Sequence, residues 1–339
     1  MQSILKFMKA VTIFAAIFTF STFSLSAKTT YGYSGLTAGE QAAFDTYFDD
    51  EAANTESGDL TNSYASFAAG MPGAALASTN GLGVSYGPGP KVAVFGFDYS
   101  LGISDSTGSY TDLFSKGPGS VEGVGSNLSI MAGMNLGVLP VPFLSKMKVY
   151  INFMAMTLPL SNVGSISFLN FGINIQYSIL DDVPIVPGLM TWGGLRVTTG
   201  YRLTTMDVSF SKVALGNYQV TSGLTWQPKA TMSSQSDVSS IPVEVSSSFD
   251  LIFITFFGGL GLDFNFGSTD FTVKAEGGFK ESNGTAWVKT TKTIQPTAVD
   301  YRLFGGVQIN IFAVKLVTQF NWAPSSDSYG ILGGLRVAF

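Results

Sequence analysis

The stretch SYGILGGLRVAF, residues 328–339, indicates the fold more clearly than any other part of the chain. In an extended strand, successive side chains point to opposite faces. Here one face is apolar, whereas the other carries small residues and Arg336. Such a strand suits a wall between lipid and a polar lumen, so the stretch predicts the last strand of a transmembrane β-barrel. The apolar face consists of Tyr329, Ile331, Leu335, Val337 and Phe339.

Composition agrees with a barrel and argues against helical membrane spans. Charged residues make up only 12% of the chain, and the mean hydropathy is +0.29. Soluble domains usually carry about 25% charged residues. Beyond the N-terminus, however, no segment reaches the roughly 18 unbroken apolar residues that a spanning helix needs. The chain is rich in apolar residues but has no long apolar stretch. Apolar residues at alternate positions explain both facts, and this pattern is typical of membrane β-barrels.

Alternation of this kind recurs along the chain and predicts ten strands. The expected fold is therefore all-β, a transmembrane antiparallel up-and-down β-barrel of about 10 strands, with a range of 10–12. The predicted strands cover residues 91–103, 126–138, 146–158, 166–180, 191–206, 243–266, 270–280, 299–312, 313–323 and 328–339.

The connections between these strands predict an orientation. Bacterial barrels place short turns in the periplasm and longer loops outside. Counting back from Phe339 puts the periplasmic turns at 312–313, 267–269, 181–190 and 139–145. The outside loops then fall at 105–125, 159–165, 207–242, 281–298 and 324–327. We expect 207–242 to protrude outside as a strand-rich flap. A four-residue turn from Gly267 to Asp270 would make Asp263 and Lys274 cross-strand neighbours.

Charged residues within the strands fall on the polar face and are expected to line the lumen. All four arginines of the chain do so, which supports the register because a lipid-facing charge costs about 2–4 kcal/mol at the bilayer midplane. Solvation and cross-strand pairing explain these charges more simply than a dedicated binding site. The predicted lumen charges are Lys148, Arg196, Arg202, Asp263, Lys274, Glu276, Arg302, Lys315 and Arg336.

Glycine pairs recur inside the predicted strands, although glycine weakens a strand. We expect them either to allow sharp coiling with aromatic rings covering the bare backbone, or to make room for a plug. The pairs occupy residues 193–194, 258–259, 277–278, 305–306 and 333–334.

The N-terminal third divides into two parts. Residues 1–27 resemble a signal peptide, with Lys6 and Lys9 before an apolar run that ends at Ser26-Ala27, rather than a membrane anchor. Residues 28–90 are acidic and partly helical, and Thr37 and Glu40 form a capping-box pattern. This segment is expected to be a solvated periplasmic helix or a plug that docks on the basic periplasmic mouth. Residues 91–339 then form the barrel.

Missing residue types narrow the functional classes. The chain has no His and no Cys, so it lacks the His proton transfer on which known barrel enzymes rely, and it lacks His or Cys metal clusters. We therefore expect no enzyme activity, no cofactor and no metal. With 18 basic against 23 acidic residues, the chain is also a poor candidate for nucleic-acid binding.

The C-terminus also resembles the signal that the bacterial barrel-assembly machinery reads, polar-x-Gly-x-x-hydrophobic-x-aromatic. Gly334, Val337 and Phe339 match this pattern, whereas Leu332 stands where a polar residue is usual. As a whole the chain resembles bacterial outer-membrane β-barrel proteins of the spirochaete or Bacteroidota type. The resemblance implies an outer-membrane location, with outer-membrane lipid and the assembly machinery as partners, and it implies no functional residues.

Two functions remain open from the sequence. The first is a narrow channel, or a protein that transports or binds small solutes, because about ten strands leave little free lumen. The alternative is a surface-exposed structural or adhesion protein that binds surface ligands through its outer loops.

Overall fold

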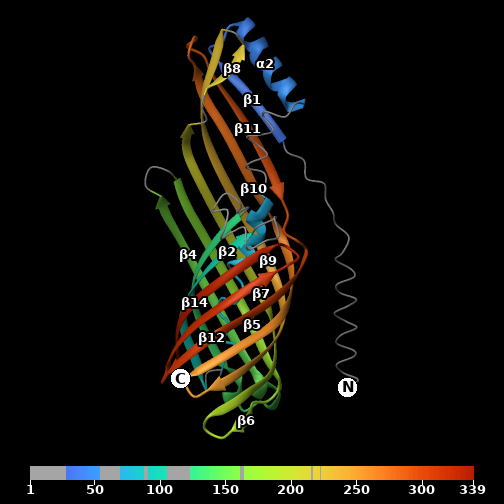
Figure 1. The fold of residues 1–339 in the computed structure, drawn as a ribbon, viewed down its shortest axis with the longest axis vertical. Helices are drawn as coiled ribbons and strands as arrows, with labels where there is room; N and C mark the ends of the chain where they lie inside the picture. The colour runs from blue at the N-terminus through green and yellow to red at the C-terminus, as the bar shows by residue number, and fades with distance from the viewer. Residues whose placement is uncertain are drawn as a thin grey trace.

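The computed structural model describes residues 28–53, 69–87, 91–104, 123–160, 164–214, 217–221 and 223–339. The predicted signal peptide and most of the predicted 105–125 loop lie outside these residues. Ten antiparallel strands close a ring, which confirms the predicted fold class (Figure 1). In ring order they are β2 (Ala93–Ser104), β3 (Gly123–Asn135), β4 (Met147–Leu160), β5 (Gly164–Leu180), β7 (Met190–Ala214), β9 (Leu224–Leu251), β10 (Ile254–Phe279), β12 (Val299–Ile311), β13 (Val314–Ala323) and β14 (Ser328–Ala338).

The faces of the C-terminal strand are as predicted. In β14, Leu335 is exposed on the outer surface and Arg336 is buried in the lumen. β14 pairs with β13 so that Lys315 lies opposite Arg336, and on its other edge it pairs with β2. The same alternation around the ring gives the barrel an outer belt of exposed apolar side chains, including Phe97, Phe153 and Leu260. No helix among the described residues is long and apolar enough to span a membrane.

The division of residues 224–279 into strands differs from the prediction. β9 and β10 are joined by a two-residue turn at Ile252 and Phe253, so 243–266 is not one strand and 267–269 is not a turn. Asp263 and Lys274 consequently lie on the same strand, β10, and are not cross-strand neighbours. Asp263 pairs with Asp300 and Pro242, and Lys274 with Lys289 and Thr231.

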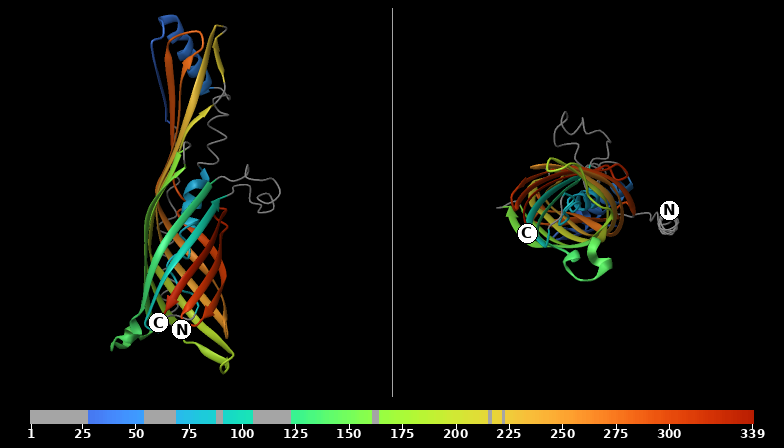
Figure 2. Two further views of the ribbon diagram at one scale, coloured as in Figure 1. Left: turned by 90° about the vertical axis from the view of Figure 1, so that its left-hand side faces the viewer. Right: turned by 90° about the horizontal axis from the view of Figure 1, so that it is seen from below.

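Three strands of the ring continue far beyond the others and carry a projecting flap (Figures 1 and 2). β9 and β10 remain paired along their whole length, from Leu251↔Ile254 to Trp226↔Phe279. The far end of β7, together with β8 (Tyr218–Thr221), β11 (Thr285–Ile294) and β1 (Lys28–Ser34), completes the sheet. We call this projection, with the helix α2 (Ala38–Ala53), the flap. The protrusion predicted for 207–242 is therefore strand-rich, but it is a continuation of the barrel wall.

At the opposite end of the barrel, two connections are two-residue turns and two are longer. They include the turns after β9 and β12, the short strand β6 (Val183–Val186), and two 3-10 helices, η2 (Leu136–Val138) and η3 (Pro142–Lys146). The C-terminus lies at this end as well (Figure 1). The backbone of Phe339 accepts a hydrogen bond from Val92 at 2.7 Å, which ties the last strand to the start of the barrel. We call this the turn end.

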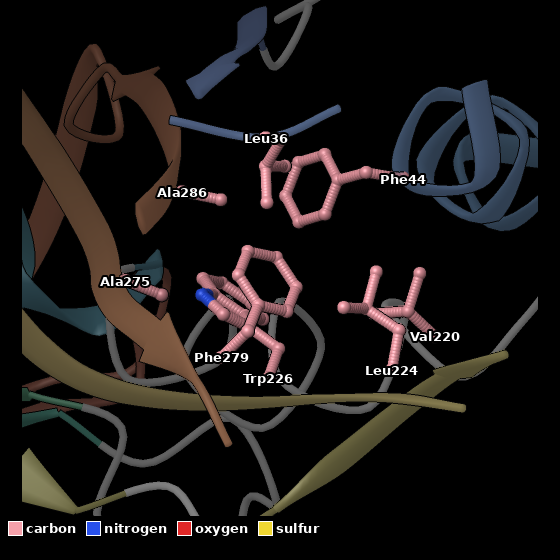
Figure 3. Packing of buried hydrophobic residues seen from close by; sticks show 8 residues of the cluster. All are labelled: Leu36, Phe44, Val220, Leu224, Trp226, Ala275, Phe279 and Ala286. Atoms are coloured by element: carbon pink, nitrogen blue, oxygen red, sulfur yellow. The ribbon is translucent and has the colours of Figure 1, made fainter. Parts of the chain in front are cut away.

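α2 packs on the flap through one buried aromatic side chain. Phe44 is fully buried and makes edge-to-face contacts with Trp226 of β9 and Phe279 of β10, at centroid distances of 5.7 and 6.0 Å (Figure 3). The prediction that the acidic segment docks on the mouth beside Lys315 and Arg336 is wrong for this helix. Its apolar side contacts an aromatic cluster in the flap instead.

The capping box predicted at the start of α2 is present. Glu40 accepts a hydrogen bond from the Thr37 backbone amide at 2.7 Å, and the Glu40 amide donates to the Thr37 hydroxyl at 3.4 Å. The hydrogen bonds from Thr37 hold the pKa of Glu40 below its ordinary value. Because the folded-state pKa is lowered, the cap stabilises the helix at neutral pH and is lost as the pH falls through that lowered value.

We expect Thr37→Ala to loosen α2 without affecting the barrel. Losing an N-cap hydroxyl costs about 1 kcal/mol, which corresponds to roughly fivefold faster amide exchange when the helix opens locally. Hydrogen–deuterium exchange of peptides from 38–53 would measure this effect, with peptides from β13 as an internal control. Unchanged exchange in α2 would show that packing of Phe44 alone fixes the helix.

Candidate functional site

The lumen of the barrel is occupied by the chain itself. Residues 69–87, which we call the plug, lie inside the ring and are nearly all buried (Figure 2). The plug is helical over 69–77 and then continues as turns and extended chain to Gly87. Its helix lies towards the flap end, where Met71, Ala75 and Leu76 pack against Met206, Val208 and Val238 of the wall.

Glycines in the wall let the plug helix approach the strand backbones. A Cβ at Gly102 of β2 would lie 2.1 Å from the carbonyl oxygen of Ala74, and one at Gly125 of β3 would lie 2.4 Å from the same atom. On β14, a Cβ at Gly330 would lie 2.6 Å from the Ala77 carbonyl oxygen. Because the obstructing atoms are backbone, larger residues could not be accommodated by a rotamer change. The wall is therefore shaped to this helix.

Below the helix, a buried carboxylate joins two strands and the plug. Glu244 of β9 accepts hydrogen bonds from Arg202 at 2.6 Å and from Arg302 at 2.5 Å. Its second oxygen accepts one from the hydroxyl of Tyr86, in the plug, at 2.5 Å. All of these side chains are almost inaccessible to solvent. Glu244 is thus the centre of an ion-paired network that crosses the lumen.

The two arginines around Glu244 have further partners that complete the network. Arg302 also donates to Asp263, with its Nε 2.8 Å from Oδ2, and to Asn321. Arg202 donates to the side chain of Asn80, in the plug, at 3.1 Å. Two cations and two carboxylates therefore balance, as buried charges require.

The other two arginines hold the lower part of the plug by its backbone. Arg336 makes a two-pronged pair with Asp98, at 3.1 and 3.0 Å, and donates to the carbonyl of Val84 at 2.6 Å. Arg196 donates to the carbonyl oxygens of Tyr86 and Gly87 at 2.7 and 3.0 Å, and pairs with Asp182 at 3.1 Å. These contacts fix the plug backbone at two levels of the barrel.

The glycine pairs of β10 and β12 lie beside the aromatic part of the plug. Phe304 covers Gly259, and Phe257 covers Gly306, since an added Cβ would lie 2.6 and 2.4 Å from these rings. Tyr86 then packs on the two rings at centroid distances of 4.7 Å and 5.5 Å. At these two pairs aromatic rings cover the bare glycine backbone, which is the covering role expected of them.

The predicted lumen charges divide into two groups. Arg196, Arg202, Arg302, Arg336, Asp263 and Lys315 are buried in the lumen, and Lys148 is half-buried near the turn end. Lys274 and Glu276 do not belong to the lumen, because they lie on the part of β10 that forms the flap. They pair there with each other at 2.5 Å and are largely exposed.

Several residues of the network, among them Glu244, Asp98 and Tyr86, were not among the predicted site residues. Glu244 lies in the region whose strand boundaries were misplaced, although its polar-face position was readable from Val243 and Val245 on either side. Asp98 lies between Phe97 and Tyr99 in the predicted strand 91–103, so its polar-face position could be read from the sequence, but its role could not. Tyr86 has no signal in the sequence, because its position depends on the path of the plug. Arg336 pairs with Asp98 of β2.

The residues of the assembly-signal pattern also have structural roles. Gly334 faces Asp98, whose Oδ1 would lie 2.1 Å from an added Cβ. Val337 pairs with Val314 on β13 and with Phe95 on β2, and the Phe339 side chain is exposed at the turn end. Within the described ranges, no cluster of three acidic, His or Cys residues could hold a metal ion.

A closed ring with an outer apolar belt and an ion-paired interior defines an integral outer-membrane β-barrel protein. The Lsa36-like family matches residues 24–339, and the chain belongs to this family. No curated protein matches the sequence.

Solved structures with a similar fold are outer-membrane barrels. The translocator domain of the autotransporter NalP from Neisseria meningitidis has 10% identity over 78% of this chain and 93% of its own, with a TM-score of 0.30. LpxR from Salmonella typhimurium has 8% identity over 72% of this chain and 100% of its own, with a TM-score of 0.26. Omp33 from Acinetobacter baumannii has 10% identity over 73% of this chain and 99% of its own, with a TM-score of 0.24. No functional residue is transferred from them.

Proposed function

We propose that this protein is a surface-exposed interaction protein, in which a closed barrel anchors the flap in the outer membrane. The observation that carries the proposal is the plug, which fills the lumen and is bound to the wall by buried ion pairs and hydrogen bonds. The flap, in contrast, is a large projecting sheet whose length a simple channel does not require.

Opening the lumen would require breaking the network around Glu244. Removing the plug would take away the Tyr86 hydroxyl and the Asn80 amide, and would leave Arg196 and Arg336 without their backbone acceptors. Because water would replace the lost partners in an open lumen, each of these hydrogen bonds contributes about 0.5–1.5 kcal/mol to closure, or about 1.5–3 kcal/mol where a charged group takes part. Together, these interactions between the plug and the wall favour a lumen that stays closed in the resting protein.

The connections indicate which end of the barrel faces outwards. Two-residue turns join β9 to β10 and β12 to β13 at the turn end. Bacterial outer-membrane barrels have short turns on the periplasmic side and longer extensions outside. In this orientation the flap projects from the cell surface.

One face of the flap sheet is polar and accessible. In it Lys229 and Thr231 of β9 lie beside Glu276 and Lys274 of β10, and Lys289 of β11 lies opposite Lys274. α2 covers the other face. Rows of Lys, Thr and Ser side chains suit hydrogen bonding to a polar partner, so we assign the interaction surface to this face.

A narrow channel is the second candidate, and one observation favours it. Several buried polar atoms of the wall, including the Oγ atoms of Ser246 and Ser248 and the side-chain amide of Asn174, have no hydrogen-bond partner in the part of the chain described here. Buried polar groups of this kind are usually satisfied by water. A hydrated path beside the plug would pass only the smallest solutes.

The test uses cells that produce the protein and two double variants. Lys229→Glu with Lys289→Glu changes the polar face of the flap, and Lys91→Glu with Lys146→Glu is a matched control at the turn end. We expect the flap variant to lose most of the attachment of wild-type cells to a panel of immobilised glycans and proteins, and the control to retain it. Equal attachment by both variants, together with stable single-channel steps of the wild-type protein in planar bilayers, would favour the channel instead.

A further inference from the structure

The two ends of the N-terminal segment lie at opposite ends of the barrel. β1 pairs with β11 in the flap, from Lys28↔Thr291 to Ser34↔Thr285. The last plug residue described, Gly87, contacts Arg196, which also pairs with Asp182 beside β6 at the turn end. β2 then begins at the turn end, where Val92 and Ala93 contact Phe339. The chain between β1 and β2 therefore spans the full height of the barrel.

Most neighbouring strands of the ring are paired over long stretches, whereas β3 pairs with β4 only near the turn end, from Ile130↔Phe153 to Asn135↔Lys148. β2 is hydrogen-bonded to β14 over eleven residue pairs, and β9 to β10 along their entire length. The plug touches the inner side of β2, β3 and β14 through Gly102, Gly125 and Gly330. The described plug residues 69–87 thus lie inside the ring, with the plug helix towards the flap and Gly87 towards the turn end.

The N-terminal residues also form part of the flap. β1 covers the free edge of β11, and the ring of Trp287 lies against Gly32, where an added Cβ would be 3.0 Å away. Leu36 and Phe44 supply two buried side chains of the aromatic cluster (Figure 3). The flap is consequently assembled from two parts of the chain, one continuous with the wall and one that precedes the plug in the sequence.

We infer that residues 28–53 cross the outer membrane inside their own barrel, so that the mature amino terminus is on the cell surface. The barrel thereby exports a segment of its own chain, which then completes the flap. This inference rests on the proposed function only for the orientation of the barrel, and not for the partner of the flap. It replaces the expectation that the acidic segment stays in the periplasm.

The lack of cysteine in the chain allows a direct test by single-cysteine labelling. Thr30→Cys marks the N-terminal strand, Gln219→Cys marks β8 in the flap, and Ser145→Cys marks η3 at the turn end; all three positions are exposed. Intact cells are treated with a membrane-impermeant maleimide. We expect Thr30→Cys and Gln219→Cys to be labelled, and Ser145→Cys to be labelled only after the outer membrane is opened.

The outcomes separate this inference from the proposed function. Protection of Thr30→Cys while Gln219→Cys is labelled would overturn the inference and leave the flap outside. Labelling of Ser145→Cys while Gln219→Cys is protected would show that the barrel has the opposite orientation. That result would overturn both the inference and the proposed function. The path is tested with Ser78→Cys combined with Asn127→Cys, since these side chains contact each other at 2.6 Å. A short bis-maleimide should link the two cysteines in native membranes. If they are not linked, although Thr30→Cys is labelled on intact cells, passage through the lumen would be excluded.

Discussion

Glu244→Gln is expected to lower the unfolding free energy of the barrel by about 3–5 kcal/mol, the cost of removing one partner from a buried ion pair. The substitution preserves the size of the side chain but removes the charge that Arg202 and Arg302 share. Arg302 retains Asp263, whereas Arg202 keeps only the neutral side chain of Asn80. Urea titration of the protein in lipid vesicles would measure the change.

Glu276→Gln is the matched control for this experiment. Glu276 is also a glutamate in a strand with a close basic partner, Lys274, but its side chain is 59% exposed. Exposed pairs contribute about 0–1 kcal/mol, so the control should unfold nearly as the wild-type protein does. Equal stability of the two variants would mean that water reaches Glu244 and that the lumen is not closed.

Gly102→Val should displace the plug helix and open the lumen. The new Cβ would lie 2.1 Å from the carbonyl oxygen of Ala74, a backbone atom that moves only if the helix moves. Valine itself suits a strand, so β2 should still form. In planar bilayers, where we expect the wild-type protein to show no stable current, this variant should give discrete conductance steps.

Gly333→Val, on β14, provides the control because an added Cβ there meets no atom within 4 Å. It should remain as silent as the wild-type protein. Folding of the Gly102→Val protein would be judged by its heat-modifiable migration on gels. If the folded variant still carries no current, the barrel stays sealed without the helix in place.

Alternation predicted the barrel well because a lipid-facing wall enforces it at every strand. The same rule failed at residues 250–257, where the true turn at Ile252 and Phe253 contains no Gly, Pro, Asn or Asp and interrupts no apolar run. Conversely, Gly267 resembles a turn residue but lies within β10, with a positive φ of 105° and no room for a Cβ against the Asp237 carbonyl. One missed turn and one false turn left the number of strands unchanged. The rule that bacterial barrels have an even number of strands therefore did not reveal the error.

The candidate site was only partly predictable for a different reason. Strand periodicity places a side chain on the inner face, and it did so for all four arginines. It does not specify height along the barrel, which is why Lys274 and Glu276 were assigned to the lumen. Nor does it reveal the plug, whose residues 69–87 have no period and are fixed by tertiary contacts with glycines and arginines on distant strands.

The continuity of β9 and β10 has a mechanical consequence. At about 3.3 Å per residue, the 28 residues of β9 extend roughly 90 Å, from the turn end to the tip of the flap. A pulling force applied at the tip acts along the strands, so it loads their many cross-strand hydrogen bonds in shear and at the same time, rather than peeling them apart one by one. A force applied to the flap would therefore pass along β9 and β10 directly into the barrel wall.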